Sequence, residues 1–135
     1  MEYSQAVYDH ASNPRNVGFI DGHDGRGECG DPECGDMAVM TIRVRDERLV
    51  EVKFLVKGCG AAIATCSIAT ELVTGKTVEQ AAQLSDEDVA QALGGLPEPK
   101  LHCSNLAATA LHRAIEDYWQ RRKTDLHDWR ALYRR

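Results

Sequence analysis

The sequence predicts a single α+β domain, and three observations lead to that prediction. The chain has 135 residues, about the length of one domain, and its 43% hydrophobic and 27% charged residues are ordinary proportions for a globular protein. Two adjacent segments show the apolar alternation of β-strands, whereas others repeat apolar residues at the spacing of helices. No proline-rich linker or internal repeat divides the sequence, so we expect residues 1–135 to form one domain.

The first half of the chain predicts a helix, a glycine-rich region and a hairpin. Glu2–Ala11 is expected to be a short helix that ends before Pro14, because the residue preceding a proline avoids the helical region. The glycines from Gly18 to Gly35 predict turns and close backbone approaches rather than core. Met37–Arg45 and Leu49–Lys57 are β-branched and alternating, which predicts an antiparallel hairpin.

The second half predicts four helices. The apolar residues of Ala61–Val73 mark a helix that ends at Gly75, a residue type common at helix ends. Thr77 and Ser85 each stand three residues before a side chain that can return a hydrogen bond, so each begins a short helix. Apolar positions from Leu106 to Tyr118 recur at three and four residues, which predicts a long amphipathic helix.

Charge and hydropathy make two classes of partner unfavourable. The 16 Lys and Arg residues against 21 Asp and Glu give a net charge of −5, and proteins that bind phosphate backbones are usually basic. The longest weakly polar stretch, Gly58–Ala69, is too short to cross a bilayer, and Met1–Ser4 does not begin like a signal peptide. We therefore expect a cytoplasmic protein without nucleic-acid or membrane partners.

Three cysteines stand at separate boundaries between the expected elements. Cys34 precedes the hairpin, Cys59 follows it, and Cys103 begins the last long helix. Boundary loops can converge at one end of a domain, where their side chains are free to bind a ligand. Because Asp36 and His102 stand beside these thiols, the sequence predicts a soft metal site made of these five residues.

The positions of two of these cysteines favour thiolates. Cys59 and Cys103 fall at expected helix amino termini, where unpaired N–H groups and the helix dipole lower a thiol pKa. Lys100 lies three residues before Cys103 and adds a positive charge. We therefore expect Cys59 and Cys103 to be deprotonated readily.

The remaining cysteines and histidines have weaker signals. Cys66, inside an alanine-rich helical run, is expected to be a small core residue. Cys29 could be a further ligand, a redox-linked partner of Cys34 or a solvent-facing thiol, and spacing does not choose among these. No cysteine neighbours the other histidines, which are expected on surfaces or helix faces: His10, His23, His112 and His127.

Several motifs resemble those of a known family. They are Asn13-Pro14-Arg15-Asn16-Val17-Gly18, Cys34-Gly35-Asp36, Gly58-Cys59-Gly60-Ala61-Ala62 and Lys100-Leu101-His102-Cys103-Ser104. In this order they resemble the IscU/NifU N-terminal family of iron-sulfur cluster assembly scaffolds, over about residues 3–123. The resemblance implies a small three-stranded antiparallel sheet with helices packed on one side.

The same resemblance implies an assembly scaffold and not an enzyme. A [2Fe-2S] cluster would be built from iron and persulfide, held by Cys34, Cys59 and Cys103 with Asp36 and His102 nearby, and passed to apo-proteins. Zinc can occupy the same pocket when iron is absent. A four-cysteine site would hold a cluster more firmly, so a mixed site suits a donor.

The resemblance also implies protein partners. A cysteine desulfurase would deliver sulfur, with Cys103 as the persulfide acceptor assisted by Lys100. Leu96–Lys100 resembles the segment by which an Hsp70-type chaperone, with its co-chaperone, grips scaffolds of this family, although Glu98 and Pro99 depart from the usual residues.

Two other hypotheses compete with the scaffold. Zinc accepts the same Cys, His and Asp ligands, so the site could be a structural zinc centre or one that assists sulfur transfer. A cysteine-dependent enzyme with Cys103 as nucleophile and His102 as base is less favoured, because adjacent residues seldom orient as such a pair. The zinc-dependent branch of the family has a long insertion between the positions of Cys59 and Cys103, and this sequence has none.

Overall fold

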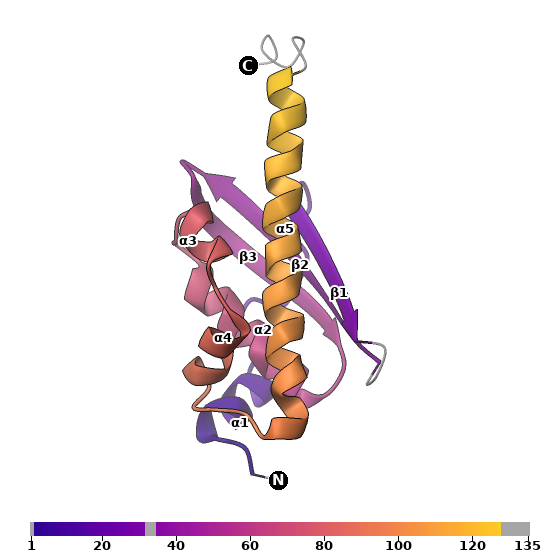
Figure 1. Ribbon diagram of the computed structural model, residues 1–135, viewed down its shortest axis with the longest axis vertical. Coiled ribbons are helices and arrows are strands. Elements are labelled where there is room, and N and C mark those ends of the chain that lie inside the picture. The colour runs from indigo at the N-terminus through magenta and orange to yellow at the C-terminus, as the bar shows by residue number, and fades with distance from the viewer. Residues whose placement is uncertain (1, 32–34, 128–135) are drawn as a thin grey trace.

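The computed structural model describes residues 2–31 and 35–127 as a three-stranded sheet packed against helices (Figure 1). In chain order the elements are α1 (Gln5–Ser12), β1 (Gly25–Asp31), β2 (Asp36–Arg45), β3 (Arg48–Lys57), α2 (Gly60–Val73), α3 (Val78–Ala82), α4 (Asp86–Ala92), the 3-10 helix η1 (Glu98–Lys100) and α5 (Leu101–His127). The sheet is antiparallel in the order β1-β2-β3, as the resemblance implies. Among the described helices, none is long and apolar enough to cross a membrane.

The predicted hairpin is confirmed as β2 and β3. Met40 pairs with Phe54 and Ile42 pairs with Val52, and these four side chains are buried on the face that α2 and α5 cover. Positive φ angles at the two turn residues allow the tight reversal between the strands. The hairpin therefore supplies one wall of the core. The first residues of β2 lie at one end of the sheet.

Strand β1 lies within the glycine-rich region that the sequence analysis assigned to turns, so that assignment is wrong for Gly25–Asp31. The expected close approaches are present. A Cβ at Gly25 would lie 2.2 Å from the carbonyl oxygen of Ala114, and one at Gly27 would lie 2.2 Å from that of Ala110. Glycine is needed here because the backbone of α5 occupies the space of a side chain, and Figure 1 shows α5 running along the sheet.

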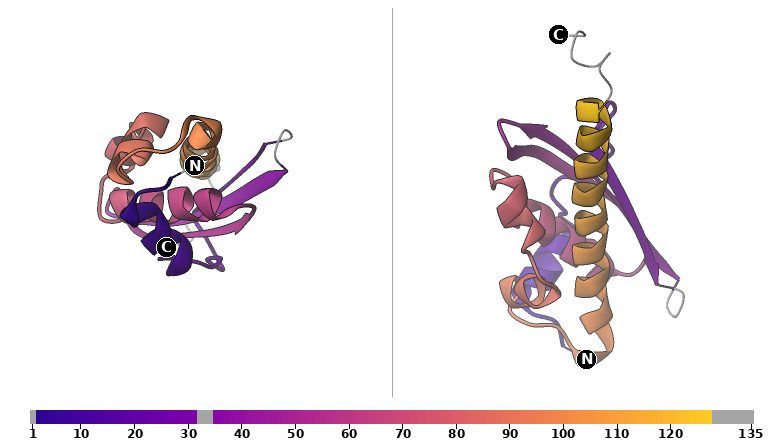
Figure 2. Two further views of the ribbon diagram at one scale, coloured as in Figure 1. Left: turned by 90° about the horizontal axis from the view of Figure 1, so that it is seen from below. Right: turned by 45° about the horizontal axis from the view of Figure 1, so that its top comes forward.

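The other helices agree with their predicted starts. Thr77 begins α3 and Ser85 begins α4, and both form complete capping boxes. Helix α2 ends at Val73, shortly before Gly75, which has a φ of +89°. Helix α5 is longer than the periodic segment predicted, since it begins at Leu101 and extends past the end of the sheet (Figure 2).

His10 joins α1 to α2 and is buried, so of the two predicted placements, surface or helix face, it takes the helix face. Its Nδ1 lies 2.7 Å from the hydroxyl of Ser67, and its Nε2 lies 3.4 Å from a carboxylate oxygen of Glu71. Burial lowers the pKa of His10, and the nearby Arg15 lowers it further, whereas Glu71 and Asp9 raise it. The native state therefore favours neutral His10.

The packing of α5 on β1 predicts the effect of one added methyl group. Gly27→Ala should lower the free energy of unfolding by about 3 kcal/mol, because the new Cβ overlaps the backbone of α5. Urea unfolding measures the change. Gly60→Ala is the control, since its Cβ would be in ordinary contact with Ala11 at 3.6 Å; equal stability of the two variants would contradict the close approach.

The burial of His10 predicts a pH dependence of stability. Because its folded pKa is below the ordinary value of 6.5, the unfolded chain binds more protons near that pH. The stability that neutral His10 contributes is present above pH 6.5 and is lost as the pH falls below it. Chemical denaturation at a series of pH values should give a flatter profile for His10→Gln than for the parent, and parallel profiles would refute this role.

Candidate metal centre

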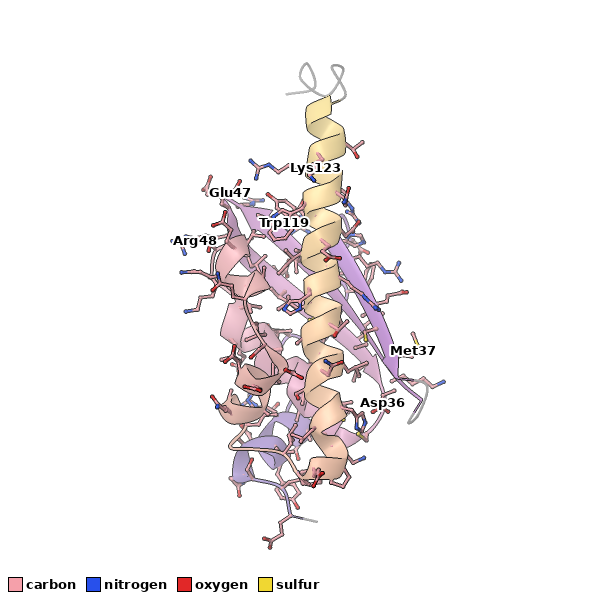
Figure 3. The ribbon with its side chains drawn as sticks, in the orientation of Figure 1. Asp36, Met37, Glu47, Arg48, Trp119 and Lys123 are labelled. Atoms are coloured by element: carbon pink, nitrogen blue, oxygen red, sulfur yellow. The ribbon has the colours of Figure 1, made fainter. Side chains whose placement is uncertain are left out.

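Three side chains from distant parts of the sequence meet at one end of the sheet. Asp36 begins β2, Cys59 is the N-cap of α2, and Cys103 lies in the first turn of α5. One ligand atom from each lies within 4.8 Å of the other two, and in the part of the chain that the structure describes this is the only such group of Cys, His, Asp and Glu. Figure 3 places Asp36 beside the amino-terminal half of α5.

The contacts within this group place Cys59 between the other two residues. Its Sγ lies 3.5 Å from Oδ2 of Asp36, to which it donates a hydrogen bond, and 3.9 Å from Sγ of Cys103. The Nε2 of His102 lies 3.6 Å from Sγ of Cys103. The structure therefore brings together four of the five predicted site residues, and the fifth, Cys34, lies outside the described residues.

Gly58 makes room for the buried carboxylate of Asp36. A Cβ at Gly58 would lie 2.3 Å from Oδ1 and 2.5 Å from the carboxyl carbon. Sequence analysis did not assign Gly58 a role, although its place between the hairpin and Cys59 is a signal of close approach. The glycine therefore acts as a positioning residue, because it lets Asp36 turn toward Cys59.

The two described site thiols differ in burial. Cys103 is fully buried, whereas Cys59 is half-buried. Burial raises the pKa of the Cys103 thiol well above its ordinary value, and the neighbouring Cys59 and Asp36 raise it further, while Lys100 lowers it by less. The expectation that Cys103 is readily deprotonated is therefore wrong for the metal-free protein, because desolvation outweighs the helix terminus. A bound metal ion would reverse this, since thiols lose their proton on coordination.

Lys100 interacts electrostatically with both described thiols of the group. Negative charge on Cys59 is the largest cause that raises the pKa of Lys100, and Cys103 contributes less. The sequence analysis paired Lys100 with Cys103 because of its spacing, whereas its stronger electrostatic partner is Cys59. A positive charge therefore faces the more accessible thiol.

The two extra cysteines stand apart from this group. Cys66 is fully buried in the core, which confirms the prediction, and burial raises its pKa to about 12. Cys29 is half-buried in β1 and packs against the same core, so it is not a freely solvent-facing thiol. It does not belong to the candidate ligand group among the described residues.

The comparison with known families agrees with this geometry. The family described as NifU-like N terminal domain matches residues 2–125. The chain belongs to this family. Relatives in the family include iron-sulfur cluster assembly scaffold protein IscU 1 of Archaeoglobus fulgidus, 55% identical over 119 residues, which are 88% of this chain and 78% of the relative. IscU of Escherichia coli strain K12 is 45% identical over 127 residues, 91% of this chain and 98% of the relative.

Solved structures of similar fold extend the comparison. FiSufU from Fervidobacterium islandicum has a TM-score of 0.68 at 22% identity and covers 84% of this chain and 96% of its own. The N-terminal part of a nitrogen-fixing NifU-like protein from Brucella abortus has a TM-score of 0.55 at 21% identity, with 95% and 87% covered. These likenesses show that the α+β fold is shared.

The close approach of Gly58 to Asp36 predicts that a side chain at position 58 lowers the affinity of the site for a metal ion. Gly58→Ala should weaken Zn²⁺ or Co²⁺ binding about tenfold or more, because its Cβ pushes the carboxylate away from Cys59. Titration against a competing chelator measures the affinity. Gly60→Ala, on the other side of Cys59, is the matched control and should bind like the parent; equal affinities for both variants would exclude the positioning role.

Proposed function

We propose that this protein is a scaffold on which a [2Fe-2S] cluster is assembled from iron and persulfide sulfur and from which it is transferred to apo-proteins. The observation that carries the proposal is the convergence of Asp36, Cys59 and Cys103 within 4.8 Å. Relatives with 45–55% identity are named iron-sulfur cluster assembly scaffold proteins, and these names describe scaffolds rather than enzymes.

The donor set suits a cluster that is cargo. Thiolates are the usual ligands of iron-sulfur clusters, and Cys59 and Cys103 supply two of them. Asp36 offers a harder oxygen ligand that binds such a cluster less firmly. We propose that Cys34 is the third thiolate and that His102, beside Cys103, is the alternative to Asp36. Such a mixed set favours release to an acceptor with four cysteines.

The partners follow from the same proposal. A cysteine desulfurase supplies the sulfur, Cys103 is a persulfide acceptor, and Lys100 attracts the persulfide anion. Glu98 and Pro99 are exposed beside Lys100, so Leu96–Lys100 is accessible to an Hsp70-type chaperone and its co-chaperone. Free thiols at the site favour a reducing compartment, and we place the protein in the cytoplasm.

Anaerobic reconstitution tests the scaffold function. With ferrous iron, cysteine, a desulfurase and dithiothreitol as the reductant that converts persulfide sulfur to sulfide, the parent should gain iron and acid-labile sulfide in equal amounts, with visible cluster absorption. Cys59→Ser and Cys103→Ser should lose most of it, because each removes a thiolate. Cys66→Ala is the control, since this buried cysteine does not belong to the ligand group among the described residues. If the parent forms no cluster while Zn²⁺ stays bound, the zinc alternative replaces the proposal.

Transfer of the cluster tests the role of Asp36. Asp36→Ala should slow transfer to an apo-ferredoxin about tenfold, because the cluster is then held by thiolates and imidazole, which exchange more slowly than a carboxylate. Stopped-flow circular dichroism follows the transfer. Equal rates for the variant and the parent would remove Asp36 from the release step.

A further inference from the structure

We propose that sulfur enters this site at Cys59 and passes from there to Cys103, so that the two thiols act in series. This inference rests on the proposed scaffold function and specifies the order of its sulfur steps. It differs from direct delivery to Cys103, which the spacing of Lys100 and Cys103 in the sequence favours. Burial, the position of Lys100 and the distance between the two sulfurs support the order.

Burial separates the two thiols. Cys103, in the first turn of α5, is fully buried, whereas Cys59 is half-buried at the N-cap of α2. Thiol–persulfide exchange requires direct contact between the attacking sulfur and the sulfur attacked. A persulfide carried by another protein can therefore reach Cys59 in the native fold, whereas the fully buried Cys103 offers it no exposed surface.

The positive charge at the site also favours entry at Cys59. Lys100 ends the 3-10 helix η1, in which no residue is buried, and Cys59 is its strongest electrostatic partner. An incoming persulfide is an anion, and an ammonium group at the same thiol attracts it and offers a hydrogen bond. Lys100 therefore has the position of a receiving group for Cys59.

The distance between the thiols permits the second step. Sγ of Cys59 and Sγ of Cys103 are 3.9 Å apart. A sulfur–sulfur bond is about 2.05 Å long, so an extra sulfur on Cys59 can come into contact with Cys103 by rotation of the side chain. Among the described residues, Cys66 is in the core and Cys29 is not part of this group, so neither offers an equivalent route.

Both steps balance without an added oxidant or reductant. In the first, the thiolate of Cys59 attacks the outer sulfur of the donor persulfide; a new S–S bond forms on Cys59, the donor S–S bond breaks, and the donor leaves as a thiolate. In the second, Cys103 attacks the outer sulfur now on Cys59. The S–S bond of Cys59 breaks, Cys59 regains a proton, and Cys103 loses one as its own S–S bond forms.

Trypsin separates the thiols and makes the order measurable. Cleavage after Lys57, Lys76, Lys100 and Arg113 gives the peptides 58–76 and 101–113, which carry Cys59 and Cys103. The Cys66→Ala background removes the second cysteine of peptide 58–76. The protein is mixed with a cysteine desulfurase and cysteine, and samples are alkylated at intervals and digested. Mass spectrometry then measures the fraction of each peptide that carries an extra sulfur atom.

In the Cys66→Ala protein the extra sulfur should appear on peptide 58–76 first and on 101–113 later. Adding Cys103→Ser should leave sulfur on 58–76, whereas adding Cys59→Ser should slow labelling of 101–113 at least tenfold. Cys29→Ser is the matched cysteine control and should change neither rate. Labelling of 101–113 before 58–76, or at the parent rate in Cys59→Ser, would overturn the relay.

A second reconstitution separates failure of the relay from failure of the scaffold. Iron and inorganic sulfide without desulfurase bypass both persulfide steps, so the parent should still form a cluster. Cluster formation with the wrong labelling order would overturn the relay alone. No cluster under either condition would overturn the scaffold function. The time course in the Cys66→Ala protein tests the order even where a serine variant unfolds.

Discussion

Helix α5 lies so close to β1 that no side chain fits between them at Gly25 and Gly27. This contact sets the position of the whole helix relative to the sheet, because the backbone of β1 packs directly against the backbone of Ala110 and Ala114 in α5. Two side chains reinforce it: Asp117 accepts a hydrogen bond from the amide of Arg26, and Arg113 donates one to the carbonyl of Glu28. The position of Cys103 in the first turn of the same helix follows from that packing.

The site combines one thiol that reaches the surface, Cys59, with one that is buried, Cys103. Asp36 and Cys103 are buried, whereas Cys59 reaches the surface and has the ammonium of Lys100 beside it. A buried thiol with a raised pKa stays protonated and is shielded from oxidants until a metal ion or a persulfide reaches it. The arrangement therefore separates the point where reactants arrive from the point where they are retained.

Local patterns were sufficient to predict much of the fold. The alternation of β2 and β3 and the capping boxes at Thr77 and Ser85 depend on neighbours in the sequence, and the structure has them. Strand β1 was missed because glycine is typical of turns, and only the packing of α5 explains it as strand. The burial of His10 could not be predicted from its neighbours in the sequence, because its partner Ser67 lies 57 positions away.

In the candidate site, too, some features could be predicted from the sequence and others depend on the folded protein. Cysteines at element boundaries predicted the convergence of Cys59, Cys103 and Asp36, because boundary residues gather at one end of a small domain. The protonation of Cys103 could not be predicted in this way, since the charge of a thiol depends on the water excluded by the finished core. The role of Gly58 likewise depends on a carboxylate that comes from a different strand.

The 27 residues of α5 make it a rod about 40 Å long. Its close contact with β1 lies near the middle of that rod, Cys103 lies toward one end, and the other end projects past the sheet. One continuous helix therefore joins a buried candidate ligand to a surface on the far side of the sheet contact.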